Sequence, residues 1–147
     1  MRKIYTIGFS KKFLREFVKL LKNSQIEKLI DIRLNNTSQL SGYAKKDDLA
    51  YIMELINIEY VHDISLAPDN KLLSDYKKNL VDWGDYKTRY LNILEERNIK
   101  DSINELTNNK TVCLLCSEHK PNKCHRSLLA SFIKNNLNED LDIIHLI

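Results

Sequence analysis

Apolar and polar positions divide the chain into short β-rich runs separated by stretches of helical periodicity. Continuous or alternating apolar runs predict strands over 3–10, 27–33, 58–66, 110–117 and 141–147. Apolar residues at helical spacing predict helices between them, the first capped by Ser10 and the others over about 47–57 and 123–137. A broken helical pattern fills 68–108, where we expect Gly84 to interrupt it.

This order of elements is β-α-β-α-β-(helices)-β-α-β, which favours a three-layer α/β/α, Rossmann-like domain with a largely parallel sheet of about five strands. The run over 110–117 is apolar on both faces, as expected of a strand in the middle of such a sheet. With 147 residues, the chain fits one domain, 1–147, that includes 68–108 as a helical insert. The insert could form a lid or a partner surface, or it could simply cover one face of the sheet.

Composition narrows the functional classes only slightly. The net charge of +3 permits a nucleic acid or phosphate partner without indicating one. No apolar run approaches the roughly 18–20 residues of a membrane span, so we expect no membrane partner. Three cysteines without a disulfide-scaffold pattern favour a reducing cytoplasm.

Polar or small residues recur at the carboxyl ends of the predicted strands, which is where open α/β sheets bind their ligands. If the strands are parallel, these residues converge on one rim and form a site. The alternative is that polarity simply resumes at strand ends, as it does in any α/β protein. The residues are Gly8, Ser10, Asp31, Arg33, His62, Cys116, Glu118 and His145.

Asp31 and Arg33 are two positions apart on a predicted strand, so their side chains share a face. They could form a structural ion pair with each other. Alternatively, Arg33 faces an anionic ligand while Asp31 orients it. His62 alone is weak evidence, because a single histidine on a strand is more often structural than catalytic.

The densest reactive chemistry lies in "CSEHKPNKCHRS", residues 116–127. It supplies four zinc-ligand types in Cys116, His119, Cys124 and His125. However, seven residues separate the two cysteines, and Cys124 and His125 are adjacent on a predicted helix. The spacing therefore argues against zinc, and we expect neither a metal nor a cofactor.

Cys116 follows a strand and precedes a helix, the position of the nucleophile in cysteine phosphatases and sulfurtransferases. The phosphatase pattern requires arginine six residues later, where this chain has Asn122, and the intervening loop has no glycine. The topology fits a thiolate nucleophile and the motif does not. A reversible disulfide between Cys116 and Cys124 is a further alternative.

Helix phase gives the segment a third interpretation. His125 points in the same direction as the apolar face of the predicted helix, so we expect it to be mostly buried against the sheet. Arg126 lies at the edge of that face, in a first turn whose N–H groups and dipole attract anions. An arginine there needs an acidic partner, which would be Glu118, Asp31 or a ligand. The apolar face is formed by Leu128, Leu129, Phe132 and Ile133.

Four blocks, "GFS", "DIR", "YVH" and "CSEHKPNKCHRSLLA", together resemble a bacterial and archaeal family named domain of unknown function 488. The family pattern is G-H-S, D-V-R, Y-x-H and C-x-E…C-H-R-S-L-L-A in the same order, over nearly the whole chain. The resemblance implies a single α/β domain in a cytoplasmic protein and carries no established reaction. The matching residues are Gly8, Ser10, Asp31, Arg33, Tyr60, His62, Cys116, Glu118, Cys124, His125 and Arg126.

The chain also departs from this family pattern. Phe9 replaces the family's first histidine, and "SLAPD" replaces the L-G-G that usually follows the strand-three histidine. A site that used either feature would be altered here. His119 falls outside the family pattern, which further weakens a four-ligand zinc site.

Three hypotheses follow. In the first, the protein is a hydrolase or transferase acting on a nucleotide or nucleic acid. Arg126 and Arg33 then hold the phosphate, Glu118 or Asp31 acts as acid or base, and Cys116 is a candidate nucleophile. The second is a nucleotide-binding or sensor module without turnover, and the third a structural polar network or a zinc site. The remaining assigned residues are Ser10, Gly8, His62 and Tyr60 for ligand binding, and Cys124 and His125 as structural polar groups.

Overall fold

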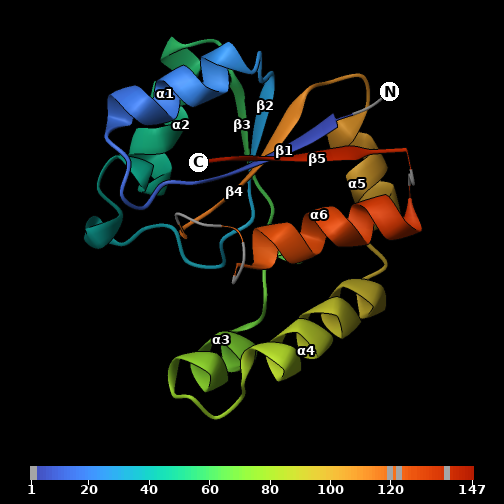
Figure 1. Cartoon of the computed structure of the whole chain (residues 1–147). Coiled ribbons are helices and arrows are strands. Elements are labelled where there is room, and N and C mark those ends of the chain that lie inside the picture. Colours follow the sequence, from blue (N-terminus) through green and yellow to red (C-terminus); the bar gives the residue numbers. More distant parts are fainter. Residues whose placement is uncertain (1–2, 119–120, 122–123, 138–139) are drawn as a thin grey trace.

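The computed structural model describes residues 3–118, 121, 124–137 and 140–147. In this part of the chain, five parallel strands form one sheet in the order β3-β2-β4-β1-β5. The chain begins and ends in the same sheet, because β1 lies between β4 and β5 (Figure 1). The strands are β1 (Lys3–Gly8), β2 (Lys28–Asp31), β3 (Glu59–His62), β4 (Val112–Cys116) and β5 (Asp142–Leu146).

Helices cover both faces of the sheet, which confirms the predicted three-layer α/β arrangement (Figure 1). One face carries α1 (Leu14–Asn23) and α2 (Lys46–Leu55). The other carries α6 (His125–Asn136), together with α3 (Asn70–Lys77), α4 (Trp83–Glu96) and α5 (Lys100–Thr107). The α3–α4 hairpin packs against α6 and lies farther from the sheet (Figure 1). None of the helices in the described ranges is both long enough and apolar enough to cross a membrane.

Strand β4 is buried along its whole length, as its apolar sequence predicts. Cys113 and Leu115 belong to the core under α1 and α2. Val112, Leu114 and Cys116 alternate with them and belong to the core on the α6 side. The period of two along a strand thus supplies apolar side chains to both layers.

Several predicted boundaries are wrong. β1 and β2 each end two residues earlier than predicted, at Gly8 and Asp31, so Arg33 follows β2 instead of lying on it. The third strand ends at His62 rather than at 66, because the Asp63 carboxylate accepts the backbone N–H of Ser65 (3.0 Å) and starts a 3-10 turn over Ile64–Leu66. Ser10 does not cap α1, whose N-cap is Phe13. The chain turns first at Lys11, which has a positive φ of 60°, and the Glu16 carboxylate accepts the backbone N–H of Phe13 (3.4 Å).

The interruption within the insert also lies elsewhere. Gly84 is inside the first turn of α4, and the helices are broken between α3 and α4, before Asp82. The carboxylate of Asp82 accepts the backbone N–H of Asp85 (2.8 Å), so it satisfies a donor that has no partner within the helix. A capping aspartate therefore determines this boundary, while the glycine is tolerated near the helix start.

The carboxyl ends of β1 and β4 form the topological switch point of the sheet. These strands are neighbours, yet the helix after β1 covers one face and the helix after β4 covers the other. The order differs from the Rossmann order 3-2-1-4-5-6, because β4 lies between β2 and β1. Open α/β sheets bind ligands beside such a point, which directs attention to the residues after Gly8 and Cys116.

Candidate functional site

The predicted rim residues converge on the carboxyl edge of the sheet but divide between its two faces. Asp31, Arg33 and Tyr60 form one group on the side of α2. The other group lies where α6 begins, and it consists of Cys116, Glu118, Cys124, His125 and Arg126. The first group is a buried carboxylate with its hydrogen-bond donors, whereas the second contains a disulfide, a histidine and a buried arginine.

Asp31 is the centre of the first group and is completely buried. Its oxygens accept both the Nε–H and an Nη2–H of Arg33, at 2.8 and 2.6 Å. The Tyr60 hydroxyl (2.6 Å) and the Asn36 amide (3.1 Å) also donate to it. Burial would raise the pKa of Asp31, but the hydrogen bonds and charge of Arg33, with those of Tyr60 and Asn36, outweigh it and lower the pKa. A carboxylate with this many donors is a poor general base.

Asn36 was not predicted to belong to this group. It lies in a polar loop, where an asparagine normally indicates only a turn. His62 is also drawn in, because its Nε2–H donates to the backbone carbonyl of Arg33 (2.7 Å). These contacts give the loop after β2 a fixed conformation.

Arg33 pairs with Asp31 and also retains an unused donor. Its Nη2 donates to the carbonyl of Ala44 (2.7 Å), and its guanidinium lies 5.2 Å from the centre of the Phe9 ring. Its Nη1 is buried without a hydrogen-bond partner in the described part of the chain. Such a donor costs about 1–3 kcal/mol when it is left unmatched, so it indicates a position where a ligand acceptor would be stabilising.

Arg126 is completely buried rather than at the edge of a helix face. Its Nε donates to the Thr6 hydroxyl (3.1 Å), and its Nη1 donates to Cys116 Sγ (3.5 Å) and to the backbone carbonyl of Glu118. Burial lowers the pKa of Arg126 to about 10, so it remains charged at neutral pH. The side chain thereby ties α6 to β1, β4 and the loop after β4.

Gly8 lies against this same loop. A Cβ at Gly8 would be 1.5 Å from the carbonyl oxygen of Glu118 and 2.5 Å from Arg126 Nη1. The next amides continue the contact, since Phe9 and Ser10 donate to the carbonyls of Cys116 (3.4 Å) and Ser117 (3.0 Å). Only glycine permits this approach, so Gly8 and the Ser10 backbone position the loop at the switch point.

Thr6 extends the network to the edge strand β5. Its hydroxyl accepts from Arg126 Nε and is also hydrogen-bonded to Nδ1 of His145 (2.6 Å). Burial and the charge of Arg126 both lower the pKa of His145. Thr6 gave no signal in the sequence, because a threonine in an apolar run is also an ordinary strand former.

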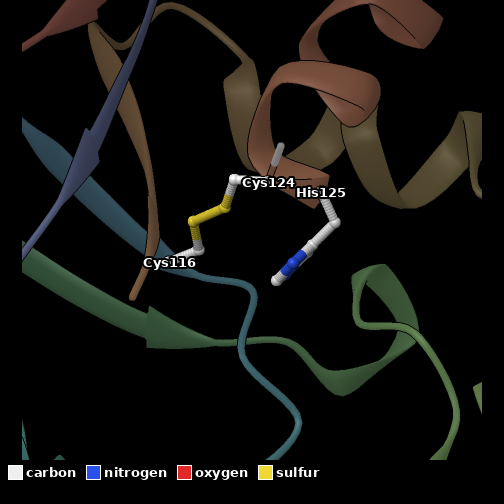
Figure 2. A group of neighbouring side chains, drawn as sticks. All are labelled: Cys116, Cys124 and His125. Carbon is white, nitrogen blue, oxygen red and sulfur yellow. A yellow bond between two sulfur atoms is a disulfide. The ribbon is translucent and has the colours of Figure 1, made fainter. Parts of the chain in front are cut away.

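Cys116 and Cys124 form a disulfide that joins the end of β4 to the N-cap of α6 (Figure 2). In this state, Cys116 carries no thiolate. His125 follows in the first turn, where its Nε2–H donates to the carbonyl of Ile32 (2.9 Å). Burial is the main cause that lowers the pKa of His125 to about 4. His119, a possible zinc ligand by residue type, and Asn122, at the position of the phosphatase arginine, lie outside the described residues.

A cavity of about 530 Å³ opens between this edge of the sheet, the start of α6 and the α3–α4 hairpin. The sheet side contributes Arg33, Ser117, Glu118, Cys124 and His125. The hairpin contributes an aromatic wall and a lysine, in Tyr76, Lys77, Trp83 and Tyr86. The rings of Trp83 and Tyr86 are stacked at 5.2 Å, and those of Tyr76 and Tyr86 are 4.9 Å apart.

The hairpin residues were not predicted to belong to the site. Tyr86 and Tyr90 have helical spacing within the broken pattern over 68–108, and both are buried. Trp83 and Tyr76 are only partly buried and line the cavity. Their aromatic character was the available signal, but nothing local placed the hairpin beside the motif residues.

Comparison with curated proteins found no match. Comparison with solved structures found none either. The family model described as "Domain of unknown function DUF488" matches residues 13–133, which include Asp31, Arg33, both cysteines of the disulfide and Arg126. Because the match covers well over half of the chain, the protein belongs to the DUF488 family.

Proposed function

We propose that the protein binds a phosphate-bearing ligand, best represented by a nucleotide, in the cavity beside the start of α6. The observation that carries this proposal is the lining of the cavity, in which the aromatic rings of the α3–α4 hairpin occur together with the cationic side chains of Arg33 and Lys77. A volume of about 530 Å³ falls within the roughly 300–1,000 Å³ of small-molecule sites. Cytoplasmic location belongs to the same proposal.

The aromatic wall supports the part of the proposal that concerns the nucleotide base. Trp83 is half-buried and stacked on Tyr86, so a base could extend a stack that already exists. Stacking of a base on an aromatic side chain contributes about 1–3 kcal/mol and tolerates different bases. The hairpin thus acts as a partner surface for the ligand as well as a cover for α6.

The cationic side chains and the backbone N–H groups support the part of the proposal that concerns the phosphate group. Arg33 and the exposed Lys77 both line the cavity, and Arg33 Nη1 has no hydrogen-bond partner among the described residues. The cavity also contains Cys124 and His125, where the N–H groups of α6 begin. Arg126 supports the loop after β4 and is assigned a positioning role instead of direct contact with phosphate.

Glu118 is the acid–base candidate if the ligand is turned over by hydrolysis or transfer. It is exposed and lines the cavity, whereas the oxygens of Asp31 are occupied by Arg33, Tyr60 and Asn36. Binding without turnover is the competing form of the proposal. Product formation that is lost in Glu118→Gln, with nucleotide affinity kept, would separate the two.

Nucleotide binding is expected to quench the fluorescence of Trp83, the only tryptophan in the chain. Oxidised, metal-free protein would be titrated with nucleoside mono-, di- and triphosphates, nucleosides, inorganic phosphate and a single-stranded oligonucleotide. We expect saturable quenching by nucleotides, with a rise in Tm equivalent to about 2.7 kcal/mol at 100 times Kd. An oligonucleotide that binds more tightly would make nucleic acid the ligand.

Lys77→Gln and Lys78→Gln form a matched pair for this titration. Both lysines are exposed at the end of the same helix, but only Lys77 lines the cavity. We expect Lys77→Gln to weaken nucleotide binding roughly two- to five-fold, and Lys78→Gln to leave it unchanged. Equal binding of nucleosides and nucleotides would refute the phosphate contact, and a lack of quenching by every probe would refute the site.

A further inference from the structure

The fold brings together three metal-ligand side chains that their spacing in the sequence had appeared to keep apart. Ligand atoms of Cys116, Cys124 and His125 lie within 4.8 Å of one another. Figure 2 shows the two cysteines linked and the His125 side chain beside them. We propose that these residues, with the cysteines reduced, bind a zinc-type divalent ion, and that the disulfide and the metal complex are alternative states of one site.

The backbone already suits the reduced, metal-bound form. Tetrahedral zinc with Zn–S bonds of about 2.3 Å holds two sulfurs roughly 3.7 Å apart. The Cα atoms of Cys116 and Cys124 are 7.5 Å apart, beyond the roughly 4.4–6.8 Å usual for disulfides. Once the S–S bond is broken, rotation of the cysteine side chains can therefore separate the sulfurs without moving β4 or α6.

His125 is held as metal-binding histidines are held. Its Nε2 must carry the proton that is donated to the Ile32 carbonyl, so Nδ1 has the free lone pair. Metal-ligating histidines almost always donate their other ring N–H to a carbonyl or carboxylate in this way. The ring also packs edge-on against Tyr90, with centroids 5.7 Å apart, which restricts its rotation.

The donor set selects the class of metal. Two thiolates and one neutral imidazole are soft to borderline ligands, which suit zinc and disfavour magnesium or calcium. Cys124 and His125 line the cavity, so a fourth coordination position would face it. Three protein ligands with an open position are the arrangement of a catalytic zinc ion rather than a structural one.

The two states interconvert by thiol–disulfide exchange. A low-molecular-weight disulfide takes two electrons from the two thiolates, so the Cys116–Cys124 bond forms, the small disulfide splits into two thiolates and the metal ion leaves. A dithiol reductant reverses the reaction, and the ion then binds the two thiolates. The metal ion would be bound at the wall of the cavity whether or not a nucleotide binds there.

The proposal is tested by measuring zinc binding to the whole chain. The disulfide is first reduced with a phosphine, and the phosphine is then removed. We expect about one zinc ion per chain after equilibrium dialysis, and none for protein with the disulfide intact. Cobalt(II) should give a sulfur-to-cobalt charge-transfer band in the reduced protein alone. Zinc should also slow alkylation of Cys116 and Cys124 in the unmodified chain, a readout that needs no variant.

Cys113 provides the matched control, because it is a buried free cysteine on the same strand as Cys116 that faces the opposite core. We expect Cys124→Ser to weaken zinc affinity by more than 100-fold, because loss of a residue that only supports a metal ligand already costs about 10–100-fold. Cys113→Ala should bind zinc as the unmodified chain does. Circular dichroism would verify folding of both variants. The proposal is overturned if reduced protein takes up no zinc, if oxidised protein takes up as much, or if the two variants behave alike.

Discussion

Replacing Asp31 with asparagine is expected to destabilise the protein by about 3–5 kcal/mol. The substitution keeps the shape of the side chain but removes the charge that neutralises Arg33, which is only 3% exposed. Breaking one side of a buried ion pair leaves an uncompensated charge. The amide of asparagine also replaces one of the two oxygens that accept hydrogen bonds from Arg33, Tyr60 and Asn36 with a donor. Urea unfolding followed by Trp83 fluorescence would measure the loss.

Glu59→Gln is the control for Asp31→Asn. Glu59 is also a carboxylate at a strand, paired with Lys28 and Lys110, but its side chain is 45% exposed. Solvent screens such pairs, so we expect a much smaller change in the urea midpoint. If Asp31→Asn is as stable as Glu59→Gln, the Asp31 group is not a structural network, and a catalytic role for Asp31 gains support.

The same carboxylate predicts a defined acid sensitivity. Because the pKa of Asp31 is lowered in the folded state from its ordinary value of 3.8, its contribution is complete above that value and is lost as pH falls through the folded pKa. Wild-type protein should therefore lose stability below about pH 4, and the Asp31→Asn variant should lack this part of the loss. Urea midpoints from pH 7 to pH 3 should show the gap between the two proteins narrowing in acid.

Replacing Gly8 with alanine is expected to destabilise the protein by about 1–3 kcal/mol or more. The added methyl group would overlap the backbone carbonyl of Glu118, which cannot swing away as a side chain can. The loop after β4 would have to move, and with it the contacts that Arg126 and Ser10 make to that loop. Nucleotide binding should weaken as well, because Ser117 and Glu118 line the cavity.

Gly84→Ala is the matched control for this prediction. A Cβ at Gly84 meets only the Asp82 carboxylate oxygen, at 3.3 Å, and the residue is helical. Alanine should therefore be neutral or stabilise α4 by up to about 1 kcal/mol. Thermal unfolding of both variants would suffice, and a Gly8→Ala protein that melts with wild type would show that the loop has an alternative position of equal energy.

The carboxyl edge of the sheet combines a group of residues that bond to one another with a cavity that can accept a ligand. Around Asp31, almost every donor and acceptor is matched within the protein, as the structural alternative for this pair anticipated. Beside α6, the cavity and the Cys116–Cys124–His125 cluster leave chemistry available to a ligand. Arg33 connects the two groups, because it is hydrogen-bonded to Asp31 and also lines the cavity.

Local patterns were sufficient for the fold class but did not give the strand order β3-β2-β4-β1-β5. The apolar runs and helical spacings predicted the parallel sheet, the buried β4 and the covering helices, since each depends on which face of an element is apolar. Local patterns failed where a single hydrogen bond decides a boundary. Asp63 ends β3 and Asp82 begins α4, and neither effect was anticipated from apolar periodicity.

By itself, the sequence determined the α/β layering, the convergence of the motif residues on one edge and the membership of a family, because periodicity and motif order are local properties. Only the tertiary structure decided what these residues do there. Arg126 is turned inward, Cys116 and Cys124 meet across a loop, and the α3–α4 hairpin adds Trp83 to the cavity. Each of these depends on contacts between segments distant in the chain, and such pairings follow from packing the whole sheet and its helices rather than from spacing.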